Sequence, residues 1–201
     1  SAGAAAFSRE DLDQVTRLVV DTWRVGFDRD WSVRAGTLEW SCTKTADHTV
    51  DAVLAVAFFL ASRRQDGYPD WGWGELTMGP DARPDHLADA LETVGRVLSA
   101  VIAAAEPGSR AVIWRNPRVE TRGPADFAPR GALEMILHAH DVCTGLGLPF
   151  EPPTDLCSRL REHTRTWPHW GAPGWSELAV TGDAWSGLLR ASGRSRRHPV
   201  P

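Results

Sequence analysis

The stretch Glu134-Met-Ile-Leu-His138-Ala-His-Asp141 is the most informative part of this sequence. It lies within a helix predicted over residues 129–144. An α-helix turns by about 100° per residue, so Glu134, His138 and Asp141 project along one stripe. Apolar side chains flank that stripe on both sides: Leu133 and Leu137 on one, Met135 and Val142 on the other. The polar stripe therefore runs down the middle of the face that packs against the rest of the chain.

A carboxylate on a buried face must find a partner, because burying it alone costs several kcal/mol or forces it to take up a proton. Glu134 and His138 are four residues apart, so both side chains can converge on one metal ion. Asp141 is one turn beyond His138 and is placed to accept the other ring N–H of that histidine. Two alternatives remain: a Glu–His hydrogen bond within the core, or a helix face that meets solvent.

A third metal ligand is expected from a second helix, predicted over Ser41–Arg64. On that helix His48 shares a stripe with Ala52, Ala55 and Phe59. The two small alanines leave space beside the histidine, which favours a substrate pocket there over a packed interface. Two histidines and one glutamate leave coordination positions open, as catalytic metal sites do.

The remaining periodic segments are also helical, and the fold class they predict is all-α. Ser8-Arg-Glu-Asp11 has the form of a capping box, Pro84 is a good first-turn residue, and Gly145 and Gly147 are natural helix stops. We expect a flexible N-terminus over 1–7 and a four-helix bundle over 8–150. A small helical extension packed on the bundle is expected over 151–192, and a frayed tail over 193–201.

Composition excludes several functional classes. The 201 residues carry a net charge of −4, so the basic surplus of a nucleic-acid-binding protein is missing. The apolar run over residues 53–61 is about half as long as a bilayer span needs. The three cysteines form no C-x-x-C pair and no secretory signal is recognised, which favours a reducing cytoplasm.

Several residues are candidates for the walls of a substrate pocket. Trp71 and Trp73 lie in a Gly- and Pro-rich loop after the second helix, where they line a pocket or cover the end of the bundle. Arg115 lies in the segment before the fourth helix, as do Arg118 and Arg122, although solvated surface positions are the favoured interpretation of these arginines. Cys42 is close to a helix start, which can lower the pKa of a thiol, but no base is indicated beside it and a catalytic role is disfavoured.

Four segments of the sequence resemble those of a known family. Trp40-Ser41 followed by His48 resembles the W-[ST]-x6-H segment of the DinB-like superfamily. The stretch from Glu134 to Asp141 is similar to the E-x3-H-x2-D segment of its mycothiol-dependent maleylpyruvate isomerase branch. Gly145-Leu-Gly-Leu148 and the segment from Trp185 to Arg194 also resemble that branch.

The resemblance implies a DinB-like four-helix bundle in which His48, Glu134 and His138 hold a divalent metal, zinc first and nickel second. It further implies a low-molecular-weight thiol such as mycothiol as co-substrate, whose metal-bound thiolate attacks a small electrophilic molecule, giving isomerase or S-transferase activity. The alternatives are a non-catalytic bundle that binds a hydrophobic small molecule and a hydrolase or cyclase that activates water. Either a monomer or a homodimer is compatible with the sequence.

Overall fold

The structure is a computed structural model that describes residues 6–62, 64, 66–69, 72–115, 118–165, 167 and 180–196. The chain divides into two compact units. One comprises Ser8–Phe150, and the other joins the residues before Ser8 to the segment from Glu151 onward. In the described residues, no helix is both long enough and apolar enough to cross a membrane.

Helix α1 (Arg9–Val25) begins as the sequence predicts. The Ser8 side chain accepts a hydrogen bond from the Asp11 backbone N–H at 3.2 Å, and Asp11 Oδ2 accepts one from the Ser8 N–H at 3.0 Å. This reciprocal capping box satisfies two backbone donors that a helix start leaves unpaired. The buried stripe that follows includes Leu12, Val15, Val19 and Trp23.

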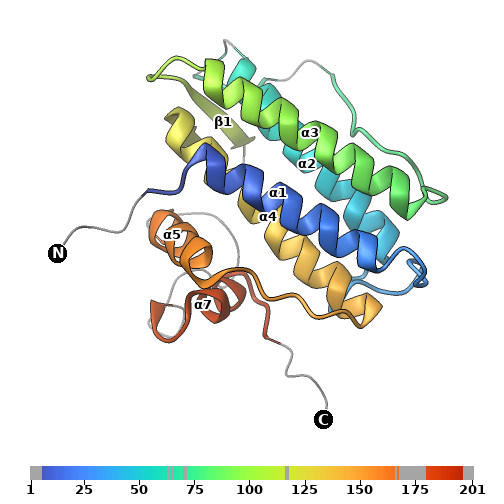
Figure 1. Ribbon diagram of the computed structural model, residues 1–201. Coiled ribbons are helices and arrows are strands. Elements are labelled where there is room, and N and C mark those ends of the chain that lie inside the picture. Colours follow the sequence, from blue (N-terminus) through green and yellow to red (C-terminus); the bar gives the residue numbers. More distant parts are fainter. Residues whose placement is uncertain are drawn as a thin grey trace. The chain divides into compact units, whose positions relative to one another are not determined.

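Four long helices form the first unit. Besides α1 these are α2 (Cys42–Ala61), α3 (Pro84–Ala104) and α4 (Gly123–Leu146). α1 packs against α3 and α4, and α2 packs against the same two helices, so the four lie side by side (Figure 1). The facing sides of all four helices bury apolar residues: Leu12, Val53, Leu60, Leu87, Leu91, Leu98, Met135 and Ile136. This burial positions α2 and α4, the two helices that carry the candidate metal ligands.

Helix α4 is longer than predicted. Pro129, where we expected it to begin, lies inside the helix, and the first turn starts at Gly123. The prediction was wrong because a proline is usually found in the first turn of a helix and disfavoured beyond it. The helix also ends two residues later than predicted: Gly145 lies inside it, and the stop is Gly147, which has a φ of 71° and whose N–H donates to the Cys143 carbonyl.

The prediction of an all-α fold misses a β-hairpin. Strands β1 (Arg110–Arg115) and β2 (Arg118–Arg122) pair antiparallel, with a bulge between Val112 and Trp114. β1 contacts α2 and β2 contacts α4. The stretch Ala111-Val-Ile-Trp114 has the apolar composition of a short strand, but β2 is short and highly charged, so the sequence gives no sign of its pairing partner. The protein is therefore mostly helical, with one small sheet.

The second unit contains α5 (Thr154–Thr164) and α7 (Ala184–Ala191), which pack against each other. Asp183 caps α7 by accepting a hydrogen bond from the Ser186 N–H at 3.0 Å. Arg196, within the stretch predicted to be a frayed tail, forms ion pairs with Glu151 and Asp183.

Candidate metal centre

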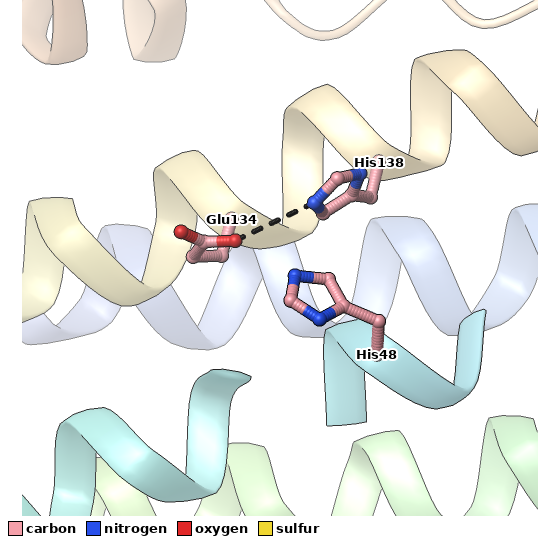
Figure 2. A group of neighbouring side chains, drawn as sticks. All are labelled: His48, Glu134 and His138. Atoms are coloured by element: carbon pink, nitrogen blue, oxygen red, sulfur yellow. Dashed lines mark ion pairs between the residues drawn. The ribbon is translucent and has the colours of Figure 1, made fainter. Parts of the chain in front are cut away.

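Helix α4 places Glu134 and His138 one turn apart on the same face. His138 Nε2 lies 3.5 Å from Glu134 Oε2, and the two side chains are 13% and 36% exposed. Figure 2 shows both side chains directed to the same side of the helix. The i, i+4 spacing in the sequence therefore produces the juxtaposition expected from it.

Helix α2 brings His48 to the same point. Its ring lies nearly perpendicular to that of His138, with the ring centres 5.1 Å apart. The Trp40 ring lies 4.9 Å from the His48 ring, so the imidazole has an aromatic neighbour besides His138. Figure 2 shows His48 reaching from its helix toward both α4 side chains.

The three side chains are close enough to share one metal ion. Each offers a ligand atom, all of these atoms lie within 4.8 Å of one another, and all three residues are half-buried. Ligand atoms 2.0–2.2 Å from a tetrahedral zinc ion are about 3.4 Å apart. The 3.5 Å between His138 Nε2 and Glu134 Oε2 is already close to that value. The remaining separations are at most 4.8 Å, so side-chain rotation has to shorten them by no more than about 1.4 Å.

Asp141 orients the ring of His138. Asp141 Oδ2 lies 3.1 Å from His138 Nδ1, and the aspartate side chain is only 4% exposed. A carboxylate can only accept a hydrogen bond, so Nδ1 carries the proton and Nε2 faces Glu134. This arrangement fixes the tautomer that binds a metal through Nε2.

The three candidate ligands differ in their protonation when no metal is bound. Although burial opposes it, hydrogen bonds to Asp141 and Glu134 raise the pKa of His138 to about 9. Burial and the nearby His138 lower the pKa of His48, which is therefore neutral at pH 7. Burial tends to raise the pKa of Glu134, but His138 and the other nearby cationic groups lower it overall. At neutral pH, His138 is thus the ligand that must lose a proton before it can bind a metal.

A cavity of about 570 Å³ opens beside these residues. Four of the predicted pocket residues line it together with His48 and Glu134: Ala52, Ala55, Phe59 and Arg115. Trp73 lines an adjoining hollow of about 280 Å³ that shares Ala55, Phe59 and Arg115 with the cavity. Trp71 lies outside the described residues. The volume is within the range of small-molecule sites, about 300–1,000 Å³.

The segment before α3 is held beside the cavity by two aspartates of α2. Asp47 accepts hydrogen bonds from the Thr77 hydroxyl at 2.6 Å and from the Met78 N–H at 2.9 Å. Asp51 accepts one from the Leu76 N–H at 2.8 Å. These bonds position Glu75 and Trp73 at the cavity and the adjoining hollow.

Sequence reasoning missed several cavity residues. Arg130 lies four residues before Glu134, so its position on the same stripe of α4 was a usable signal. Asp51 and Val56 lie on α2 next to Ala52 and Ala55, so helical spacing was a usable signal for them too. The remaining residues come from segments whose mutual contacts no local pattern reveals: Tyr68, Glu75, Ile113 and Trp114.

Three other candidates are not part of the cavity lining. Arg118 and Arg122 form ion pairs with Glu120 on β2, at 2.8 and 3.2 Å. The third candidate, Cys42, is not a thiol of lowered pKa. Its side chain is fully buried, and burial raises the pKa to about 11.

Comparison with known proteins gives a structural likeness. No family model and no curated protein matches the sequence. A solved structure of a mycothiol-dependent maleylpyruvate isomerase superposes with a TM-score of 0.58 at 14% identity, covering 95% of this chain and 92% of that one. The fold resembles that of this isomerase. A histidine-to-alanine variant of a mycothiol-dependent maleylpyruvate isomerase superposes with a TM-score of 0.53 at 14% identity, covering 87% of this chain and 77% of that one.

Proposed function

We propose that the protein is a metal-dependent enzyme that uses a low-molecular-weight thiol such as mycothiol and acts on a small electrophilic molecule. The observation that carries the proposal is the convergence of His48, Glu134 and His138 beside one cavity. The likeness to the isomerase structures supports it, and so do the sequence segments that resemble the DinB-like superfamily. In this proposal the four long helices are a DinB-like four-helix bundle.

The donor set fits a divalent ion, zinc first and nickel second. His48 and His138 would bind through ring nitrogens and Glu134 through a carboxylate oxygen, while Asp141 holds the His138 ring in place. Such an ion would lower the pKa of a coordinated thiol, so that the thiol is deprotonated near neutral pH.

The residues around the donors determine what can reach them. Ala52 and Ala55 have short side chains, so they leave space in the cavity along α2. Phe59 adds an apolar surface farther along that helix. Three protein ligands leave room at a tetrahedral ion for one further group, which is the pattern of a catalytic site. Isomerisation and S-transfer are the two reaction types that a nucleophilic thiol in such a cavity would support.

A test compares metal content with thiol-dependent activity. Protein purified without an affinity tag and without chelator is analysed for metals, and a panel of electrophiles is assayed with and without mycothiol. We expect stoichiometric zinc or nickel in the wild type. We expect metal and activity to be lost together in His48→Ala and His138→Ala. His86→Ala, an exposed histidine on α3, is the matched control and retains both.

Unchanged metal content in His138→Ala would contradict the assignment of the site. Turnover that needs no thiol would favour a hydrolase or cyclase that activates water. Metal-free protein that binds an apolar dye in the cavity would favour the non-catalytic binding protein instead.

A further inference from the structure

The two histidines of the candidate metal centre are held in different ways. Asp141 Oδ2 lies 3.1 Å from His138 Nδ1 and orients that ring. His48 has no such support: in the part of the chain that the structure describes, no hydrogen bond involves its side chain. A histidine that binds a metal usually donates its other ring N–H to a carboxylate or a carbonyl, which fixes the orientation of the ring. A different kind of contact is needed to orient His48.

The neighbours of His48 on α2 do not restrict its ring. Ala52, one turn later, has a short side chain, and the cavity of about 570 Å³ opens along His48, Ala52 and Ala55. Asp51 accepts a hydrogen bond from the Leu76 N–H instead. Open space on this side leaves the His48 side chain free to adopt other rotamers. Ordering the ring at the moment of metal binding would cost conformational entropy and weaken the binding.

The indole of Trp40 is the contact that can restrict the His48 ring. The two ring centres are 4.9 Å apart, and the ring planes are tilted by 57°. Favourable aromatic pairs have separations of about 4.5–7 Å. The Lys44 ammonium nitrogen lies 5.0 Å from the centre of the same indole, a cation–π distance. Because Lys44 and His48 are one turn apart on α2, the indole contacts two successive turns of the helix.

The backbone fixes Trp40 at the start of α2. The Ala35 N–H donates a hydrogen bond to the Trp40 carbonyl at 2.9 Å, and Ser41 pairs with Arg34 in an isolated antiparallel bridge. The Ser41 side chain accepts a hydrogen bond from the Lys44 N–H at 3.0 Å and so caps the helix. The position of the indole beside α2 is therefore set by the fold of this segment.

Trp40 is not a residue of the apolar core. Trp23, Trp31 and Trp185 are at most 3% exposed, whereas Trp40 is half-buried. Replacing Trp40 therefore removes less apolar burial than replacing a core tryptophan, and the fold should tolerate it. Its contact with His48 can be tested by substitution for this reason.

We propose that Trp40 is a positioning residue of the metal centre: its indole holds the His48 imidazole in the orientation that binds the ion. His48 would thus be held by aromatic packing, and His138 by the hydrogen bond to Asp141. Coordination to a cation draws electron density from the imidazole, and the face of an indole stabilises positive charge beside it. This inference rests on the proposed function and adds one residue to its metal centre.

Zinc affinity, measured by chelator competition, tests the role of Trp40. We expect Trp40→Leu to bind zinc about tenfold more weakly, because the His48 ring must then be ordered when the metal binds. Trp40→Phe keeps an aromatic ring and should remain within about threefold of the wild type. Trp167→Leu is the matched control. The Trp167 ring also contacts a histidine, His163, at 5.7 Å, but His163 is not a candidate ligand, so zinc affinity should not change.

NMR of the metal-free protein measures the contact itself. The signals of the His48 ring are identified by their loss in His48→Ala. An indole against the imidazole should shift the His48 ring protons upfield in the wild type, and this shift should disappear in Trp40→Leu. A merely structural role of Trp40 predicts a lower unfolding midpoint with unchanged His48 signals, which would contradict the inference.

The outcomes of these measurements separate the inference from the proposed function. Zinc affinity of Trp40→Leu within about twofold of the wild type would overturn the inference, and so would a Trp40→Phe variant as weak as Trp40→Leu. If Trp40→Leu does not fold, the metal-free wild type still decides, because His48 ring protons without the upfield shift contradict the contact. A wild type that binds no zinc contradicts the proposed function, whereas zinc binding that does not depend on Trp40 contradicts this inference alone.

Discussion

Metal binding to this site should release a proton, and the proton should come from His138. In the metal-free protein, hydrogen bonds to Asp141 and Glu134 raise the pKa of His138 to about 9, while the pKa values of His48 and Glu134 are both lowered. At pH 7, His48 is therefore a neutral imidazole and Glu134 a carboxylate, and both are ready to bind. His138 alone must be deprotonated.

The pKa of His138 sets the magnitude of the effect. Between pH 7 and pH 9 the fraction of deprotonated His138 rises from about 1% to about 50%, so the apparent metal affinity should rise by about 50-fold over this range. Above pH 9 it should rise by no more than about another twofold. About one proton should be released per ion bound at pH 7.5.

Asp141→Asn tests whether Asp141 causes this behaviour. The variant removes a negative charge beside Nδ1, so the pKa of His138 should fall toward its ordinary value of 6.5 and the pH dependence above 7 should flatten. The ring also loses its carboxylate support, which should weaken binding at pH 9 by about 10- to 100-fold. At pH 7 the loss of metal affinity should be smaller, because in the variant the metal no longer has to displace a proton from His138.

Chelator competition with zinc at a series of pH values gives the affinities, and calorimetry in two buffers of different ionisation enthalpy counts the protons. Asp89→Asn, which removes an exposed carboxylate on α3, is the control and should behave as the wild type. A wild-type affinity that is flat between pH 7 and 9, with no proton released at pH 7.5, would refute the protonation scheme.

Two further predictions concern stability and are checked by thermal and urea unfolding of the metal-free protein. A Cβ at Gly145 would clash with the carbonyl oxygen of Arg34, so Gly145→Ala should destabilise by about 1–3 kcal/mol. Gly74→Ala, which meets nothing within 4 Å, should be nearly neutral, and equal losses in both would contradict the steric argument. Ser8→Ala removes the hydrogen bond to the Asp11 N–H and should cost about 1 kcal/mol, whereas an unchanged midpoint would contradict a stabilising cap.

Local patterns in the sequence were sufficient for the elements that carry the site. In the structure, α1 begins at the capping box of Ser8 and α4 ends at Gly147. Local patterns can predict such ends because the backbone geometry there depends on a few neighbouring residues. The pairing of Glu134 with His138 follows from helical spacing in the same way. The predicted start of α4 was wrong because the packing around Gly123–Pro129 outweighs the usual preference of proline for the first turn.

What the sequence by itself determined is therefore confined to single helices: their ends, their buried faces, and the three polar groups that α4 aligns. The position of His48 against those groups depends on how α2 packs against α4, and the cavity depends on how the hairpin and the segment 66–76 lie along α2. Contacts between residues far apart in the chain are set by the complementary shapes of many side chains together, and no short pattern encodes them. For that reason only the tertiary structure brings Arg115 and Arg130 into one cavity with His48 and Glu134.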